Sequence, residues 1–126
     1  ASKPGLKTPP GIAVYEAEGA FFFGVTELLR DTMSLGAAPP KVLILRMRHV
    51  LALDASGLRA MQDLAKVCGR LGCRFILSGV HSQPLRAMQN SGVLDQLGRD
   101  NVLGGSLDAA LKRGLALLAA EESAKS

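Results

Sequence analysis

The residues most suited to bind another molecule lie in the run Asp54-Ala55-Ser56-Gly57, at the expected start of a helix. Asp54 is a good N-cap residue, which places Ser56 in the first helical turn. Backbone N–H groups in that turn have no partner within the helix, and the helix dipole is positive there. The pattern favours an anion, including a phosphate on Ser56, although the Asp54 carboxylate would repel it. The same residues also fit a structural role, in which Asp54 caps the helix and Gly57 permits close packing.

A second group of polar residues, Ser78, His81, Ser82 and Gln83, follows the expected strand Phe75 to Leu77. Ligands of open α/β sheets bind at the carboxyl ends of the strands, so these residues should lie near the turn at Asp54 if the two strands are neighbours. The candidate residues for binding an anion, or a nucleotide, are therefore Asp54, Ala55, Ser56, Gly57, Ser78, His81 and Ser82.

A catalytic role is disfavoured. A hydrolase triad of Ser56, His81 and Asp54 would lack a Gly-x-Ser-x-Gly elbow, and it would use an aspartate already committed to capping. Ser78-Gly79-Val80 has too few glycines for a dinucleotide loop, and Gly104-Gly105 lacks the Lys-Ser/Thr of a phosphate-binding loop. We predict no catalytic residues and no cofactor.

The two cysteines, Cys68 and Cys73, are accompanied by no further cysteine and no nearby histidine. This spacing supports neither a disulfide framework nor a zinc site, and it fits a reducing compartment. We predict no metal site.

Composition narrows the class of protein further. A chain of 126 residues, 48% hydrophobic and 21% charged, is expected to form one globular domain. The net charge of +4 comes from scattered Lys and Arg, and the chain has no Trp and one Tyr, which argues against nucleic-acid binding. No apolar run approaches the roughly 20 residues needed to cross a bilayer.

The first third of the chain predicts a linker arm, two strands and a helix. Residues 1–11 are rich in proline and glycine, as linkers are. Ile12 to Ala17 and Phe21 to Phe23 read as two short strands across a turn, which we expect to pair antiparallel. Apolar residues at helical spacing then predict a helix from Val25, which Gly36 ends.

The remainder alternates strands with helices. Val42 to Leu45 is apolar on both faces, which is typical of a central strand. A helix follows the Asp54 cap and ends at Gly72. Further elements are then expected in the order strand, short helix, short strand and final helix, in these places: Phe75 to Leu77, Gln83 to Gln89, Val102-Leu103, and Leu107 to Ala120.

This order predicts an α/β fold, because right-handed crossovers between such strands build a parallel sheet. We expect a small, mostly parallel sheet of four to five strands with an antiparallel N-terminal edge strand. About four helices should lie largely on one face. The folded domain should span residues 12–120, and residues 121–126 should form a flexible tail.

Several segments together resemble a known family. Val14-Tyr15-Glu16 through Phe21-Phe22-Phe23-Gly24, Val42 to Arg48, Asp54 to Leu58 and Leu77 to Val80 are similar in order and spacing to the STAS domain of bacterial SulP anion permeases, over residues 12 to about 118. The phenylalanine run points to the permease branch rather than to free-standing anti-sigma-factor antagonists.

The resemblance implies a non-catalytic, cytoplasmic C-terminal domain of an inner-membrane transporter of sulfate, bicarbonate or dicarboxylates. Its implied partners are the transmembrane domain of the same chain, a second copy of itself, and a protein partner or kinase. An N-terminus that starts at Ala1 without Met fits a piece cut from a longer chain, and it equally fits removal of an initiator Met before a small residue.

The alternative is a free-standing antagonist that acts as a phospho-switch. In such relatives a partner kinase phosphorylates the serine that matches Ser56, and the phosphate abolishes partner binding. Here Ala55 replaces a frequent serine, which leaves Ser56 as the single hydroxyl of the motif. Nucleotide binding has also been proposed for the family, but this sequence carries no strong nucleotide fingerprint.

Overall fold

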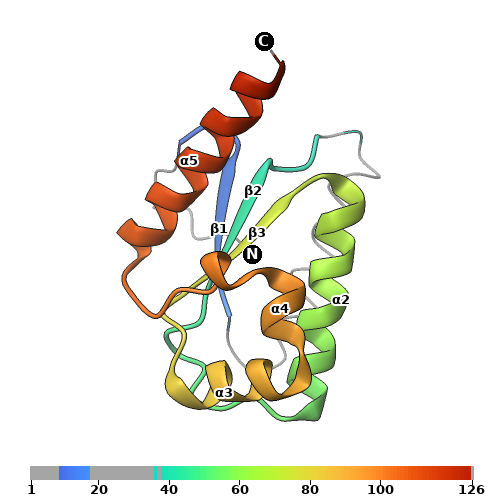
Figure 1. The fold of residues 1–126 in the computed structure, drawn as a ribbon, viewed down its shortest axis with the longest axis vertical. Helices are drawn as coiled ribbons and strands as arrows, with labels where there is room; N and C mark the ends of the chain where they lie inside the picture. The colour runs from blue at the N-terminus through green and yellow to red at the C-terminus, as the bar shows by residue number, and fades with distance from the viewer. Residues whose placement is uncertain (1–8, 18–35, 37, 126) are drawn as a thin grey trace.

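The protein forms a parallel β-sheet with helices on both faces (Figure 1). The computed structural model describes residues 9–17, 36 and 38–125. Its strands are β1 (Ile12–Glu16), β2 (Val42–Arg46) and β3 (Arg74–Ser78), in the spatial order β1-β2-β3, and both pairings are parallel. Leu77 also forms an isolated parallel bridge with Val102, where a last short strand was expected. The predicted α/β class with a parallel sheet is confirmed.

The central strand β2 explains why the run from Val42 to Leu45 is apolar throughout. Leu43 and Leu45 belong to the larger hydrophobic core on one face of the sheet. Val42 and Ile44 belong to a smaller core on the other face. All four side chains are fully buried, so each face of β2 needs apolar residues.

The helices are divided between these two cores. They are α2 (Ala55–Leu71), α3 (Ser82–Ser91), α4 (Val93–Leu97) and α5 (Leu107–Lys125), with a short 3₁₀ helix η1 (Arg99–Asn101). Buried residues of α2, α3 and α4 pack into the larger core, whereas Ala110 of α5 packs into the smaller one. Figure 1 shows α5 and α2 on opposite sides of the sheet, with α3 beside the start of α2.

Helix α2 has the ends that its sequence predicts. Its buried side chains recur on one face: Ala60, Met61, Leu64, Val67 and Cys68. Asp54 is the N-cap, and Gly72 at the C-terminal end adopts the left-handed conformation with φ of 71°. A residue without Cβ takes this conformation at little cost, which is why a glycine ends the helix here.

Strand β1 runs parallel to β2, its neighbour in the described sheet, and the antiparallel pairing predicted for β1 with Phe21 to Phe23 stays a prediction. Ile12 pairs with Val42 and Glu16 with Arg46 in a parallel register. A parallel pair needs a crossover rather than a tight hairpin, and the chain between Glu16 and Val42 is long enough to make one. The expected strand Phe21 to Phe23 and the expected helix from Val25 lie outside the described residues.

Two further differences concern helices near the C-terminus. The sequence did not predict α4 and η1, which are short. Helix α4 lies between Gly92 and Gly98, both with positive φ, and η1 lies between Gly98 and Val102. Helix α5 continues to Lys125, past its expected end at Ala120. Within the described ranges, no helix combines the length and the hydropathy needed to traverse a bilayer.

Candidate functional site

The turn that begins α2 is built around the side chain of Asp54. Its Oδ1 accepts a hydrogen bond from the N–H of Gly57 at 2.9 Å, and its carbonyl oxygen accepts one from Leu58 at 3.0 Å. The predicted N-cap is therefore confirmed. Over the residues that the structure describes, no acceptor reaches the N–H groups of Ala55 or Ser56, so two donors remain open to a ligand or to water.

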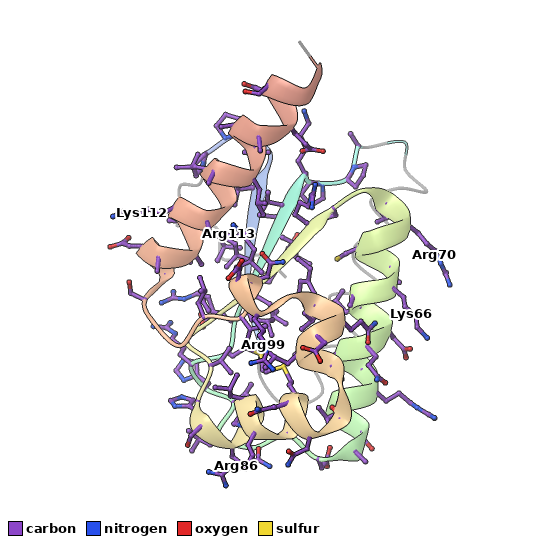
Figure 2. All side chains as sticks on the ribbon, viewed as in Figure 1. Lys66, Arg70, Arg86, Arg99, Lys112 and Arg113 are labelled. Carbon is purple, nitrogen blue, oxygen red and sulfur yellow. The ribbon has the colours of Figure 1, made fainter. Side chains whose placement is uncertain are left out.

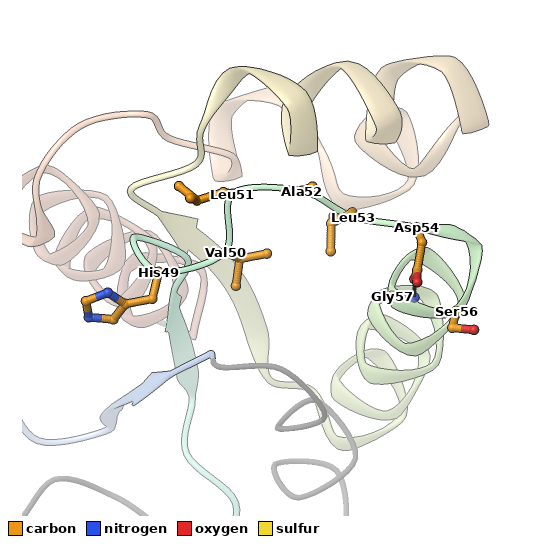
Figure 3. Close-up of a pocket in the computed structure, with 8 residues that line it drawn as sticks. All are labelled: His49, Val50, Leu51, Ala52, Leu53, Asp54, Ser56 and Gly57. Carbon is orange, nitrogen blue, oxygen red and sulfur yellow. Dashed lines mark hydrogen bonds between the residues drawn. The ribbon is translucent and has the colours of Figure 1, made fainter.

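Ser56 presents its hydroxyl to the exterior. The residue is exposed, and Figure 3 shows its Oγ pointing away from the loop that precedes α2. A hydroxyl at the second position of a helix lies close to the open amides and the positive end of the helix dipole. An anionic group on or near Ser56 would gain from both, and the neighbouring Asp54 carboxylate would oppose it.

A shallow hollow of about 470 Å³ lies beside this turn (Figure 3). It is lined by His49, Val50, Leu51, Ala52, Leu53, Asp54, Ser56 and Gly57. Val50 and Leu53 are buried, whereas Leu51 is 70% exposed. Leu51 therefore places one apolar side chain at the surface beside the polar start of α2.

The loop between β2 and α2 is held by the start of α3. Nε2 of His81 lies 2.7 Å from the carbonyl oxygen of Arg48, and a carbonyl can only accept, so this nitrogen donates. Oε1 of Gln83 accepts from the N–H of Leu53 at 2.7 Å, and Nε2 of Gln83 donates to the carbonyl of Leu53 at 3.3 Å. The candidate turn thus sits on a loop tied to a second element.

The predicted site residues do not all meet in one place. Asp54, Ser56 and Gly57 line the hollow, and His81 bonds to the loop that leads into it. Ser82 is exposed at the first residue of α3. Ser78 is only 2% exposed at the end of β3, and it does not line the hollow.

The three residues of an imagined hydrolase triad have other partners. Asp54 accepts from Gly57, and His81 bonds to Arg48. Among the residues in view, no hydrogen bond joins Ser56 to either of them. Across the same described ranges, no three His, Cys, Asp or Glu side chains gather as a metal site would require.

A buried carboxylate at this end of the sheet was not predicted. Glu16, at the end of β1, is 6% exposed. Its Oε1 lies 2.9 Å from Nε of Arg48 and 3.9 Å from Nε2 of His49, and its Oε2 lies 3.7 Å from Nη1 of Arg46. The parallel register that pairs Glu16 with Arg46 would have revealed this cluster, but the sequence did not predict that β1 lies beside β2.

Basic residues are spread over the molecule. Figure 2 shows Lys66 and Arg70 on α2, Arg86 on α3, and Lys112 and Arg113 on α5. These side chains project from three different helices rather than forming a single stripe along one groove. The arrangement agrees with the scattered charge of the sequence.

The family model described as "STAS domain" matches residues 3–109. The chain belongs to the STAS domain family. The resemblance inferred from the segments at Val14, Val42, Asp54 and Leu77 is thereby confirmed. In this STAS domain the turn Asp54–Leu58 lies at the carboxyl end of the sheet, as the sequence reading expected.

Two solved structures resemble this STAS domain over nearly its whole length. A sulfate transporter family protein from Wolinella succinogenes is 33% identical, with a TM-score of 0.76, and the match covers 93% of this chain and 95% of that one. The STAS domain of a SulP transporter from Vibrio cholerae is 27% identical, with a TM-score of 0.77, and the match covers 90% and 88%.

A curated relative is similar in sequence. A Bacillus subtilis (strain 168) protein that carries the name sulfate transporter YvdB is 26% identical over 93 residues. The match covers 73% of this STAS domain but only 18% of the relative, so the domain spans about a fifth of that protein's length.

Proposed function

We propose that this STAS domain regulates a SulP-type anion transporter from the cytoplasmic side of the inner membrane, by binding rather than by catalysis. Its similarity to the STAS domain of a SulP transporter over 90% of the chain supports this proposal. The partners we propose are the transmembrane domain of the same polypeptide and a second copy of the domain. The transported ion would be sulfate, bicarbonate or a dicarboxylate.

The proposed contact surface is the start of α2, from Asp54 to Leu58, together with the loop before it. The observation that carries this choice is the exposed Leu51 beside the open first turn of α2. An apolar anchor next to unpaired N–H donors lets one partner bury a side chain and accept hydrogen bonds at the same place. The bonds from Gln83 to Leu53 limit the entropy that the loop would lose on binding.

Transport by the full-length gene product tests this surface. We expect Leu51→Asp to lower the uptake of labelled anion while the amount of transporter in the membrane stays unchanged. Leu115→Asp is the matched control, because Leu115 is 46% exposed but lies on α5 across the sheet. Uptake should remain at the wild-type level in that variant.

Two results would overturn the proposal. One is a full-length gene product without membrane-spanning segments. The other is an uptake that responds equally to Leu51→Asp and Leu115→Asp, because the surface around Asp54–Leu58 would then have no special role.

A second candidate function is a phospho-switch at Ser56 that controls binding of an anti-sigma factor or similar partner. The observation that favours it is the exposed hydroxyl in the first turn of α2. A phosphate there would bring about two negative charges next to open N–H donors and next to Asp54, so it would change the surface strongly.

Intact-mass measurement separates the two candidates. The protein is incubated with ATP and the kinase encoded beside it, and the switch predicts a gain of one phosphate on the wild type and none on Ser56→Ala. An unchanged wild-type mass, or an equal gain on Ser56→Ala, would exclude the switch at this position.

A further inference from the structure

The two cysteines occupy linked positions at the C-terminal end of α2. The N–H of Cys73 donates to the carbonyl of Cys68 at 2.8 Å, and the N–H of Gly72 donates to that of Gly69 at 3.3 Å. With Gly72 in the left-handed conformation, these two bonds form a Schellman motif. In this motif the residues at the positions of Cys68 and Cys73 bring their side chains together.

The two thiols share one buried environment. Both side chains belong to the larger core, where Cys68 is 1% exposed and Cys73 is 5% exposed. The neighbouring Cys73 thiol raises the pKa of Cys68, with burial adding to the rise. The neighbouring Cys68 thiol lowers the pKa of Cys73, against the opposite effect of burial. Cys73 is therefore the sulfur that ionises first, and a thiolate is the reactive form of cysteine.

Cys73 lies just below the surface. Its neighbours in the chain, Gly72 and Arg74, are both exposed. Its Sγ lies 3.8 Å from the carbonyl of Arg74, the first residue of β3. A helix end opens locally far more often than the whole domain unfolds, so a small oxidant can reach this sulfur.

We infer that Cys68 and Cys73 are a modification site, at which a hydroperoxide converts the paired thiols into a reversible disulfide. The Cys73 thiolate attacks the peroxide, an S–O bond forms and the O–O bond breaks. For hydrogen peroxide, the leaving hydroxide takes up the proton that the Cys73 thiol had released and departs as water. The sulfur of Cys68 then attacks the sulfenic acid, an S–S bond forms, and a second water carries away the hydroxyl and the Cys68 proton. Two thiols and one hydrogen peroxide thus give one disulfide and two waters.

The backbone is already arranged for this bond. A disulfide requires two Cα atoms within about 7 Å of each other, and a 2.8 Å hydrogen bond already joins the backbones of these two residues. The disulfide would join the last turn of α2 covalently to the segment that enters β3. A dithiol would reverse it, as expected for a reducing compartment. This inference does not depend on the proposed transporter function.

Intact mass and thiol counting test the inference in the purified protein. The chain has two cysteines, so the number of free thiols shows directly whether Cys68 and Cys73 are both reduced or joined in a disulfide. After brief exposure to hydrogen peroxide and denaturation in urea with N-ethylmaleimide, we expect a monomer lighter by two hydrogens that has lost both maleimide adducts. Dithiothreitol should restore both adducts.

Single variants give the matched controls. Cys68→Ala should leave Cys73 as a sulfenic acid that dimedone traps, and Cys73→Ala should react more slowly with peroxide. Wild type unfolded in urea before the peroxide should close the disulfide more slowly than the folded protein.

The inference is overturned if the folded wild type keeps two maleimide adducts after peroxide. It is equally overturned if it gains oxygen without losing hydrogens, or forms a disulfide-linked dimer. These masses and adduct counts are measured on the wild type, so they do not depend on whether the variants fold.

Discussion

Gln83, at the start of α3, is hydrogen bonded to both backbone groups of Leu53, accepting from its N–H at 2.7 Å and donating to its carbonyl at 3.3 Å. Leu53 immediately precedes the N-cap of α2 and is buried. The Gln83 side chain therefore provides hydrogen-bond partners for both the N–H and the carbonyl of the residue that precedes the candidate turn. Since the pair is separated by 30 positions, it joins two elements that the chain order alone does not connect.

Gln83→Ala should destabilise the domain by about 1–3 kcal/mol, because the Leu53 N–H and carbonyl would lose their partner in a partly buried place. Gln89→Ala is the matched control on the same helix, and it should change stability by less than about 0.5 kcal/mol because its side chain is exposed. Urea unfolding measures both variants. Equal losses in the two would mean that the bonds to Leu53 add no stability.

Gly79→Ala should destabilise the domain by about 1–3 kcal/mol. Gly79 has φ of 64°, and an added Cβ would lie 3.3 Å from the backbone nitrogen of Arg48. Gly69→Ala should instead stabilise by up to about 1 kcal/mol, because Gly69 is in α2 and a Cβ there would meet nothing within 4 Å. Thermal unfolding should shift in opposite directions for the two variants, and a shift in the same direction would contradict the prediction.

Glu16→Gln should cost about 1–3 kcal/mol of stability, because it leaves Arg46 and Arg48 facing a neutral amide in a largely buried place. Asp95→Asn is the control: it breaks the ion pair with Arg99, whose side chains are 77% and 66% exposed, and it should cost less than about 0.5 kcal/mol. Urea unfolding at two salt concentrations measures both. A cost for Glu16→Gln as small as that of the control would show that the cluster is not stabilising.

Tyr15→Phe should make the protein less sensitive to alkaline pH. Burial raises the pKa of Tyr15 above its ordinary value of 10.0, and the nearby charge of Cys73 raises it further. Below about pH 10 both the folded and the unfolded chain keep the phenolic proton, so the stability is fully present. Above that pH the unfolded chain ionises first, and stability is lost as the pH rises through the folded pKa.

The chain has one tyrosine, so tyrosinate absorbance follows Tyr15 directly. Native wild type should ionise at higher pH than urea-unfolded wild type. The fall in unfolding free energy above about pH 10 should be smaller in Tyr15→Phe. Identical titrations of the native and unfolded chains would contradict the prediction.

The features that could be read from the sequence are those made within one segment. Asp54 caps α2 through Gly57, three residues away, and Gly72 ends the helix through bonds to its last turn. The continuous apolar run from Val42 to Leu45 predicted a strand that is covered on both faces. Each depends on local backbone geometry or on hydrophobic periodicity, which neighbouring residues encode directly.

Tertiary structure alone decided which distant residues meet. The parallel pairing of β1 with β2 brought Glu16 to Arg48, 32 positions away, and the packing of α3 brought Gln83 to Leu53. For Cys68 and Cys73, the local end of α2 brings the two residues together, and tertiary packing buries both of them in the larger core. Strand order and register fix these contacts, and a hydrophobic pattern tells which face of a strand is buried without telling which strand lies beside it or in which direction it runs.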